Sequence, residues 1–282
     1  MANIAAKDVA ALRKLTGAGM MDCKKALGET EGDIEAAKTW LREKGLAAAA
    51  KRTGRDATQG SVVVARSEDT AVVLELACET DFVAKGEGFL DFAQQLADQA
   101  LTDGSDLLSQ KFGDTTETVD EAIKSLAGSL GENISLGRVE RFQSDSGLLD
   151  VYLHVQSDRG VLGVVVEIDG VDRGSQQAKD TAHDVALHIA SATPRYVTDD
   201  QVPESEIVAE REVVAVQAQG EGKPENVTAK IVEGRMKAFL KEIVLVDQPY
   251  IRDTSVTVGQ LVSQLGPDAK VTRFARVKIG EN

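Results

Sequence analysis

The sequence predicts an α+β protein. We expect an N-terminal three-helix bundle, then two α+β core subdomains with antiparallel sheets and an inserted helical hairpin. Three observations predict this fold class: helical apolar spacing in the first 41 residues, two strand pairs each followed by a helix, and a late pair of helical patterns joined by a Gly/Pro turn. We therefore expect units at 1–55, 56–145 and 146–282, with the helical hairpin at about 203–241.

The first unit is expected to hold three short helices. Asn3 can cap the first helix, in which Ala5 begins an apolar stripe. Gly17 and Gly19 break the pattern and end this helix. Asp33 can cap the third helix. The other apolar positions at helical spacing are Val9 and Leu12, then Cys23, Ala26 and Leu27, then Ile34, Ala37, Trp40 and Leu41.

Two features of this unit are open. Met20 and Met21 follow the glycine turn, and one of them can point outward to form an adaptable docking surface, although Met in a small bundle is more often part of the core. Residues 45–60 read as a linker, and the alanines at 47–50 could prolong the third helix by a turn or two.

The second unit begins with two strands, at 62–65 and 71–78, around a turn at 67–70. A helix should follow, because apolar residues recur at spacings of three and four, and a shorter helix is expected at about 118–126 before a strand at 134–142. The positions that predict the longer helix are Phe89, Phe92, Ala93, Leu96, Ala97 and Ala100.

A comparable order recurs in the third unit. Strands at 148–154 and 161–168 precede a helix at 176–192, which suggests related subdomains. Helices at 203–219 and after the 220–224 turn form the helical hairpin, which we expect to project from the body. The segment 241–251, a short helix near 258–265 and a strand at 271–279 complete the third unit.

Composition and charge exclude several classes of protein. The 282 residues are 42% hydrophobic and 4% aromatic, so an aliphatic core is expected. No apolar stretch approaches the ~20 residues of a membrane span and no signal peptide is recognisable, so we expect a soluble cytoplasmic protein with no membrane partner. Residues 1–55 carry a net charge of +4 within a total of −14, which leaves −18 for the remainder. An acidic body disfavours direct nucleic-acid binding, and a small basic module on it fits docking to another protein.

No catalytic, metal or cofactor site is predicted, so we do not expect an enzyme. The sequence lacks the GxxxxGK[ST], HExxH and GxSxG motifs. His183 and His188 are five residues apart with no third metal ligand nearby, which indicates surface or packing histidines. Cys23 and Cys78 lie in apolar surroundings, where a reduced cysteine acts as a small hydrophobic residue.

The junction at residues 77–85 is the most informative segment. The apolar run at 71–76 predicts a buried strand, so Asp81 and Phe82 at its exit can be held rigidly and aimed outward. Phe82 could then act as a wedge against another molecule. Alternatively, Phe82 covers the core and Asp81 caps the following helical turn.

Three strings resemble signatures of the bacterial translation elongation factor Ts family. They are LRKLTGAGMMDCKKAL at 12–27, ETDFVAK at 79–85 and IVEGRMK at 231–237. The resemblance implies a guanine-nucleotide exchange factor for elongation factor Tu, acting on its GDP-bound and nucleotide-free forms. It also implies that the first bundle resembles a ubiquitin-associated domain.

The resemblance implies three groups of partner-binding residues. Arg13, Met20 and Met21 would contact the partner's nucleotide-binding domain. Four loop residues would bind the partner, and two of them, Asp81 and Phe82, would press beside its magnesium-binding region. A Tyr-x-His pair would face its far domain. The loop residues are Thr80, Asp81, Phe82 and Val83, and the pair is Tyr152 and His154.

The helical hairpin resembles an antiparallel coiled coil that relatives use for self-association or further contacts. Some relatives carry an extra C-terminal helical module, whereas this sequence ends at Asn282, so we expect that contact to be absent or replaced. Residue patterns alone leave another function open, a non-catalytic scaffold that binds proteins through the first bundle.

Overall fold

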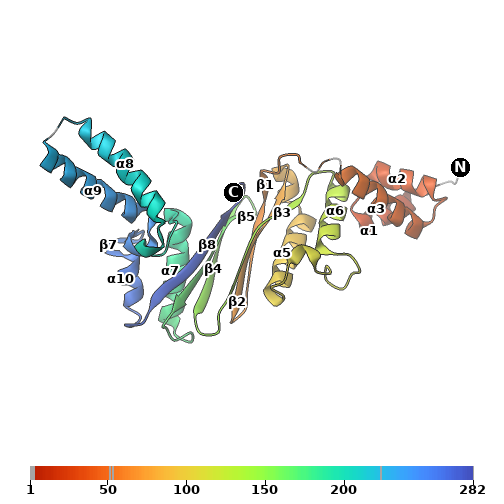
Figure 1. Cartoon of the computed structure of the whole chain (residues 1–282). Coiled ribbons are helices and arrows are strands. Elements are labelled where there is room, and N and C mark those ends of the chain that lie inside the picture. Colours follow the sequence, from red (N-terminus) through yellow and green to blue (C-terminus); the bar gives the residue numbers. More distant parts are fainter. Residues whose placement is uncertain (1–3, 51, 53, 223, 282) are drawn as a thin grey trace.

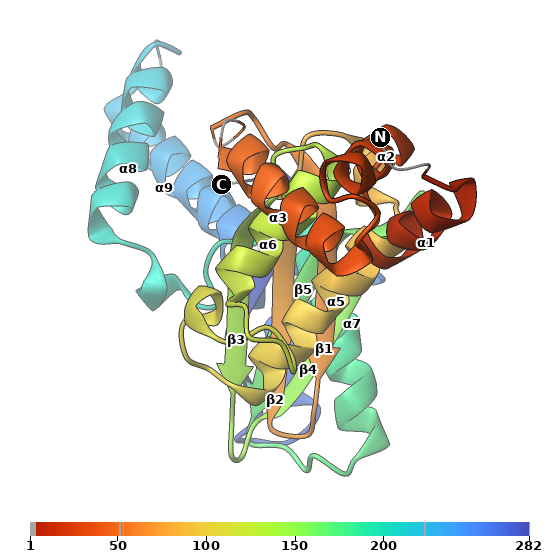
Figure 2. The same ribbon diagram turned by 90° about the vertical axis from the view of Figure 1, so that its right-hand side faces the viewer.

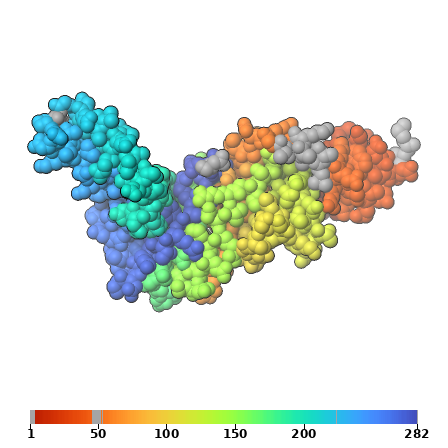
Figure 3. All heavy atoms as spheres, in the orientation of Figure 1, coloured from red at the N-terminus to blue at the C-terminus, as the bar shows by residue number. Residues whose placement is uncertain are grey.

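The computed structural model describes residues 4–50, 52, 54–222 and 224–281. The molecule is elongated, with the N-terminal bundle at one end and a helical hairpin at the other (Figures 1 and 3). Two sheets, each with its own helices, lie in the middle. The mixture of helices and small antiparallel sheets confirms the predicted α+β fold class. Within the described ranges, no helix combines the length and the apolar composition that a bilayer crossing needs.

The N-terminal bundle consists of α1 (Ala6–Thr16), α2 (Met20–Glu29) and α3 (Ile34–Ala50). Helix α1 ends where Gly17 adopts a φ of 67°, a conformation that costs glycine no steric strain. The predicted apolar stripes form the small core. Its buried members are Val9, Leu12, Ala18, Cys23, Ala26, Leu27 and Ala37.

Of the two predicted N-terminal helix caps, the structure confirms the one on α3, whereas α1 begins at another residue. Asp33 caps α3 as predicted, since its Oδ1 accepts a hydrogen bond from the Ala36 backbone N–H at 3.0 Å. Helix α1 instead begins after Ala5, whose side chain makes no capping bond. The predicted cap, Asn3, lies outside the described residues.

Helix α3 runs through the alanines to Ala50, so the segment predicted as a linker begins as helix. It crosses α6 (Val119–Leu130) of the next subdomain, as Figure 2 shows. Gly45 and Gly128 meet at the crossing, where a Cβ atom added to Gly128 would lie 2.7 Å from the Gly45 Cα. The bundle is therefore packed directly on the core subdomain.

The first core subdomain is a three-stranded antiparallel sheet in the order β1-β2-β3, covered on its outer face by α5 and α6 (Figure 1). All the predicted apolar positions of α5 are buried. Helix α6 is longer than predicted and ends at Gly131, which adopts a φ of 79°. Besides α6, the elements are β1 (Gln59–Arg66), β2 (Thr70–Cys78), α4 (Asp81–Ala84), α5 (Glu87–Thr102), η1 (Leu107–Ser109) and β3 (Ser135–Gln143).

The second core subdomain repeats this order. A strand pair is followed by a helix, and a third strand then pairs with the second strand of the pair. Its sheet has the order β4-β5-β8, again antiparallel. Ser157 and Asp158 form the two-residue turn between β4 and β5 with φ values of 53° and 63°, the sign that suits a tight hairpin. The elements are β4 (Leu148–Gln156), β5 (Arg159–Asp169), α7 (Gln176–Ala192), α10 (Val258–Ser263) and β8 (Lys270–Lys278).

The inner faces of the two sheets pack against each other. Val62 and Val73 of the first sheet and Val165 and Val277 of the second belong to one buried cluster. Gly163 lies at this contact, where an added Cβ atom would come within 2.6 Å of the Val73 Cγ1. The two subdomains are therefore closely packed on each other, and this packing holds the loops at their edges.

The inserted helical hairpin follows η2 (Asp199–Gln201) and projects from the second subdomain (Figure 1). Its arms are α8 (Glu204–Gln219) and α9 (Glu225–Ile243), so α9 ends two residues beyond the predicted boundary. The arms hold each other through the buried residues Val214, Ala218, Val232 and Met236. The chain returns through η3 (Leu245–Asp247), β6 (Pro249–Tyr250) and β7 (Asp253–Thr257).

Candidate functional site

Phe82 projects from the protein at the exit of a fully buried strand. Every residue of β2 is buried, and the chain then turns into the single helical turn α4. The Phe82 side chain is 85% exposed, the highest value among the large exposed hydrophobic residues described. The alternative in which Phe82 covers the core is therefore wrong. We call residues 79–84 the Phe82 loop.

The other side of α4 is anchored. Ala84 is fully buried in the core of the first subdomain, and Val83 packs partly against the same core. Thr80 caps the turn, because its hydroxyl oxygen accepts a hydrogen bond from the Val83 N–H at 3.4 Å. The alternative that Asp81 caps this turn is wrong, since Asp81 is the first residue inside it.

Asp81 is paired with a neighbouring cation in the free protein. The Lys85 Nζ donates to the Asp81 Oδ2 at 2.6 Å, one helical turn further on. This hydrogen bond, reinforced by the ammonium charge, holds the pKa of the Asp81 carboxyl below its ordinary value. Asp81 therefore presents a carboxylate beside the ring of Phe82 at neutral pH.

A groove of about 530 Å³ lies between the Phe82 loop and the turn of the second subdomain. Phe82 and Lys85 line one side, and Gln156 and Arg159 line the other. Arg159 donates to the Gly60 carbonyl oxygen at 2.6 Å and so connects the two subdomains here. Sequence reasoning missed Arg159, because a hairpin turn gives no signal of what lies across from it.

The predicted residues of the bundle also lie together. Met20 and Met21 are 60% and 73% exposed, so both point away from the core. The sequence had led us to expect that at most one of them would do so. With Arg13 they line a groove of about 630 Å³ between α1 and α2, floored in part by Val9. Leu15, which sequence reasoning did not single out, is also 61% exposed.

Tyr152 and His154 lie on the same face of β4. The Tyr152 hydroxyl and the His154 Nδ1 are 3.2 Å apart, and His154 is exposed. Tyr152 is half-buried against the second subdomain, with its ring edge-on to His183 at 6.0 Å. The three predicted groups thus lie on separate elements, the first on α1 and α2, the second on α4 and the third on β4.

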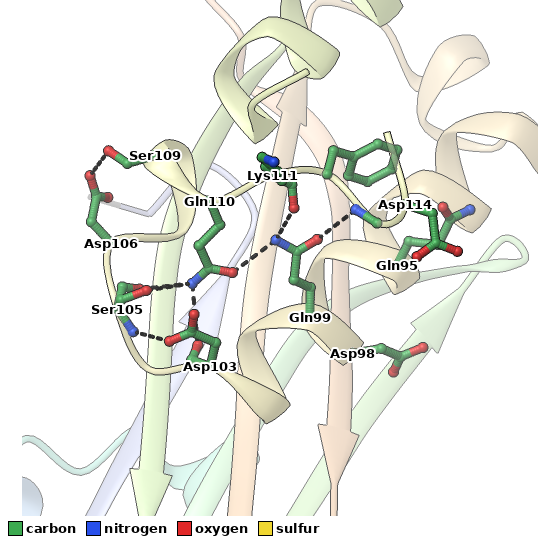
Figure 4. Close-up of a pocket in the computed structure, with 12 residues that line it drawn as sticks. Gln95, Asp98, Gln99, Asp103, Ser105, Asp106, Ser109, Gln110, Lys111 and Asp114 are labelled. Carbon is green, nitrogen blue, oxygen red and sulfur yellow. Dashed lines mark hydrogen bonds between the residues drawn. The ribbon is translucent and has the colours of Figure 1, made fainter. Parts of the chain in front are cut away.

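A wider cavity of about 800 Å³ lies beside α5 and holds none of the predicted residues (Figure 4). Several of its polar side chains form hydrogen bonds with other residues that line the cavity. The Gln99 Nε2 donates to the Gln110 Oε1 at 2.8 Å and to the Lys111 carbonyl at 2.9 Å, and the Gln110 Nε2 donates to Ser105 (Figure 4). These bonds shape the loop that follows α5.

Of the histidines and cysteines singled out in the sequence, His183 lies on the surface and His188, Cys23 and Cys78 are buried. His188 is fully buried, with its Nε2 2.8 Å from the Gln248 Oε1, and His183 is exposed and contacts the Asp150 carboxylate at 3.0 Å. Cys78 is buried, and burial raises the pKa of its thiol to about 12. In the described parts of the chain, no group of three or more His, Cys, Asp or Glu residues is placed to hold a metal ion.

Comparisons with known proteins agree with the resemblance. The sequence profile of the family described as "Elongation factor TS" matches residues 79–281. The chain is 42% identical to "Elongation factor Ts" of Clostridium novyi (strain NT) over 289 residues, covering 99% of this chain and 93% of that protein. It is 41% identical to "Elongation factor Ts" of Prosthecochloris aestuarii (99% and 100% covered) and 40% identical to that of Halothermothrix orenii (99% and 93% covered). This chain therefore belongs to the elongation factor Ts family of translation elongation factors.

Proposed function

We propose that this protein is a guanine-nucleotide exchange factor that binds elongation factor Tu and promotes GDP release. In this proposal the Phe82 loop displaces the magnesium- and phosphate-binding region of the partner. The observation that carries it is the 85% exposure of Phe82 on an anchored helical turn. An exposed aromatic ring on a rigid support adds little to the free chain and is suited to fill a pocket of a partner.

Exchange by this route is a matter of thermodynamic linkage and involves no bond chemistry. If the factor binds the nucleotide-free partner more tightly than the GDP-bound partner, GDP must weaken the factor by the same ratio. The factor then weakens GDP equally. A mutually exclusive geometry at the nucleotide site is sufficient to produce this coupling.

Magnesium is the natural target of such a geometry. The ion neutralises nucleotide phosphates and demands near-ideal octahedral coordination, so a displacement of its coordinating segment by about an ångström loosens the nucleotide. Phe82 supplies volume and Asp81 supplies negative charge beside it. Both would oppose the GDP-bound geometry of the partner.

Two further contacts are proposed to hold the partner in register. Arg13, Met20 and Met21 would contact its nucleotide-binding domain, and their shared groove on the bundle supports this. Tyr152 and His154 would face its far domain. The units 1–55, 56–145 and 146–282 would then each contribute one contact.

The helical hairpin is proposed to pair with a second copy of the chain. Val213 and Val216 of α8 are 50% and 70% exposed although the two arms already cover each other. If the pairing uses this face, Val216→Asp should abolish a concentration-dependent dimer in analytical ultracentrifugation. A wild-type protein that sediments as a monomer at all concentrations refutes it.

The exchange function is tested by measuring how tightly the protein binds the nucleotide-free and the GDP-bound forms of elongation factor Tu. We expect tighter binding to the nucleotide-free form than to the GDP-bound form, by the ratio with which the factor weakens GDP. Equal affinity for the two forms, or no acceleration of GDP release, would contradict an exchange function.

A second candidate function is a non-catalytic scaffold that binds proteins through the N-terminal bundle. The groove of about 630 Å³ with two exposed methionines favours it. Under that function, changing Met20 and Met21 to Ser removes all binding, and Phe82→Ala has no effect on any activity. Under the exchange function, Phe82→Ala impairs GDP release.

A further inference from the structure

A carboxylate from another part of the chain holds the Phe82 loop. Glu132 lies in the turn between α6 and β3, 52 residues from Thr80. Its Oε2 accepts hydrogen bonds from the backbone N–H groups of Glu79 at 3.1 Å and Thr80 at 3.0 Å. Its Oε1 accepts a short hydrogen bond from the Thr80 hydroxyl. One carboxylate thus receives three donors from two consecutive residues.

The contact is reciprocal. The Glu79 Oε1 accepts from the backbone N–H of Asn133 at 2.7 Å and lies 3.5 Å from the Arg55 Nη1. The Asn133 Nδ2 donates to the Arg55 carbonyl at 2.7 Å. The Phe82 loop, the α6–β3 turn and the segment that precedes β1 therefore form one hydrogen-bonded unit.

This unit matters because α4 cannot support itself. It contains four residues, far fewer than the ~12 that an isolated helix needs to be even marginally stable in water. Phe82 is exposed and contributes little to holding the turn in place. The fixed points are Ala84 in the core and the Thr80 cap, and Glu132 holds Thr80 from outside.

Thr80 transmits the contact to the helical turn. Its hydroxyl hydrogen is donated to Glu132, which directs an oxygen lone pair of the same group towards the Val83 N–H. Charge-assisted hydrogen bonds of this type are about twice as strong as neutral ones. The direction in which α4 presents Phe82 is therefore set by Glu132 through Thr80.

We propose that Glu132 is a positioning residue for exchange, which pre-organises the Phe82 loop before the partner arrives. The proposal rests on the exchange function proposed above. A loop already held in its binding geometry avoids the ordering cost on association, and small displacements of a reacting or displacing group are costly. Without Glu132 the ring remains present but is no longer aimed.

The test uses the full chain and the release of a fluorescent GDP from elongation factor Tu. Glu132→Ala should slow maximal stimulated release about tenfold, because three hydrogen bonds to the loop are lost together. Glu132→Gln should retain at least about half of the wild-type rate, since its amide carbonyl can accept both backbone N–H groups and its NH2 group can donate to the Thr80 hydroxyl oxygen. Asp120→Ala, which removes an α6 carboxylate paired with Lys124, is the matched control and should leave the rate unchanged.

A double-mutant cycle with Phe82→Ala separates positioning from general stability. If Glu132 acts through Phe82, adding Glu132→Ala to Phe82→Ala should lower the rate by no more than about twofold further. Full multiplication of the two effects would overturn the proposal, as would a Glu132→Ala rate within twofold of wild type or a Gln variant as slow as the Ala variant. If Glu132→Ala does not fold, Thr80→Val replaces it in the cycle and should show a loss of about threefold with the same non-additivity.

Hydrogen exchange of the free protein gives a second readout. A peptide spanning residues 79–85 should exchange faster in Glu132→Ala than in the wild type or in Asp120→Ala, and an unchanged rate would overturn the proposal. The two proposals fail differently. If wild-type protein does not accelerate GDP release, the exchange function fails, whereas if wild type and Phe82→Ala differ but Glu132→Ala behaves as wild type, only the positioning role fails.

Discussion

Phe82 and Ala84 lie on opposite sides of the same helical turn, with Phe82 85% exposed and Ala84 completely buried. Ala84 packs in the core formed by β1, β2, α5 and α6, so the turn is fixed from below while the ring stands free. The free energy of folding therefore depends little on Phe82, and its aromatic surface is available for binding another molecule.

The first prediction compares two phenylalanines on either side of this division. Phe82→Ala should change the free energy of unfolding by less than about 0.5 kcal/mol, as expected for an exposed side chain. Phe89→Ala should cost about 3–5 kcal/mol, because Phe89 is 1% exposed in the core of the first subdomain. Urea denaturation followed by circular dichroism measures both. A Phe82→Ala variant as unstable as Phe89→Ala would show that the ring supports the fold.

The second prediction concerns the ion pair of Asp81. Because the hydrogen bond from Lys85 lowers the pKa of Asp81, Lys85→Met should raise that pKa towards the ordinary value of an aspartate. Carbon-detected NMR titration of the Asp81 carboxyl measures it. Lys124→Met removes a similar i,i+4 pair on α6 and should leave Asp81 unchanged. An Asp81 pKa that does not respond to Lys85→Met would show that the pair does not persist in solution.

The third prediction tests how the bundle is held on the core. Gly128→Ala should cost about 1–3 kcal/mol, because the added Cβ would meet the backbone of Gly45 at 2.7 Å. Gly234 of α9 is the control, since a Cβ atom there meets nothing within 4 Å. Gly234→Ala should stabilise by up to about 1 kcal/mol. Destabilisation by both changes, or by neither, would contradict the close crossing of α3 and α6.

The fourth prediction follows from the buried histidine. Burial lowers the pKa of the His188 imidazole, and the hydrogen bond to Gln248 opposes this with a smaller effect. As the pH falls, the unfolded chain therefore takes up a proton on this ring before the folded protein does. The unfolded state then binds more protons below its pKa of about 6.5, and stability should fall as the pH drops from 7 through 6. The His188 Nε2 lies 2.8 Å from the Gln248 Oε1, and the centroid of the Tyr250 ring lies 6.3 Å from that of His188.

Denaturation curves between pH 5 and 8 measure this dependence. His188→Gln should flatten it, although the variant loses some stability at every pH. Equal slopes for wild type and His188→Gln would show that other groups carry the pH dependence.

The fifth prediction separates the bundle from the Phe82 loop. Changing Met20 and Met21 to Ser should raise the concentration of factor needed for half-maximal GDP release by about tenfold, with little change in the maximal rate. Both side chains are exposed, so the variant should fold as the wild type does. A lowered maximal rate at unchanged half-saturation would place the methionines in the displacement step instead.

The sequence predicted the elements well where the apolar pattern was periodic. The stripe of α5 and the buried strand β2 are examples, because burial on one face or on both imposes a recognisable spacing. The end of α6 was predicted too early, because its last turn is set by Gly131 and not by apolar residues. The contact of Gly45 with Gly128 left no signal, since glycines 83 positions apart carry no local pattern.

The candidate site was predictable in part. Local pattern singled out the two methionines and the exit of β2, and the resemblance added Arg13, Tyr152 and His154. The exposure of Phe82 decided between two interpretations that local pattern could not separate. Arg159 and Glu132 were missed. Each contacts the Phe82 loop or its surroundings from a distant segment, and such long-range contacts arise only from the packing of the two subdomains and the placing of α6.

The displacing role of Phe82 is measured most directly by stopped-flow release of fluorescent GDP from elongation factor Tu, with saturating wild-type protein or saturating Phe82→Ala. We expect the wild type to accelerate release and Phe82→Ala to lose more than about tenfold of the stimulated rate while its unfolding curve is unchanged. A folded Phe82→Ala variant that stimulates GDP release as fast as the wild type would show that the Phe82 ring does not drive exchange.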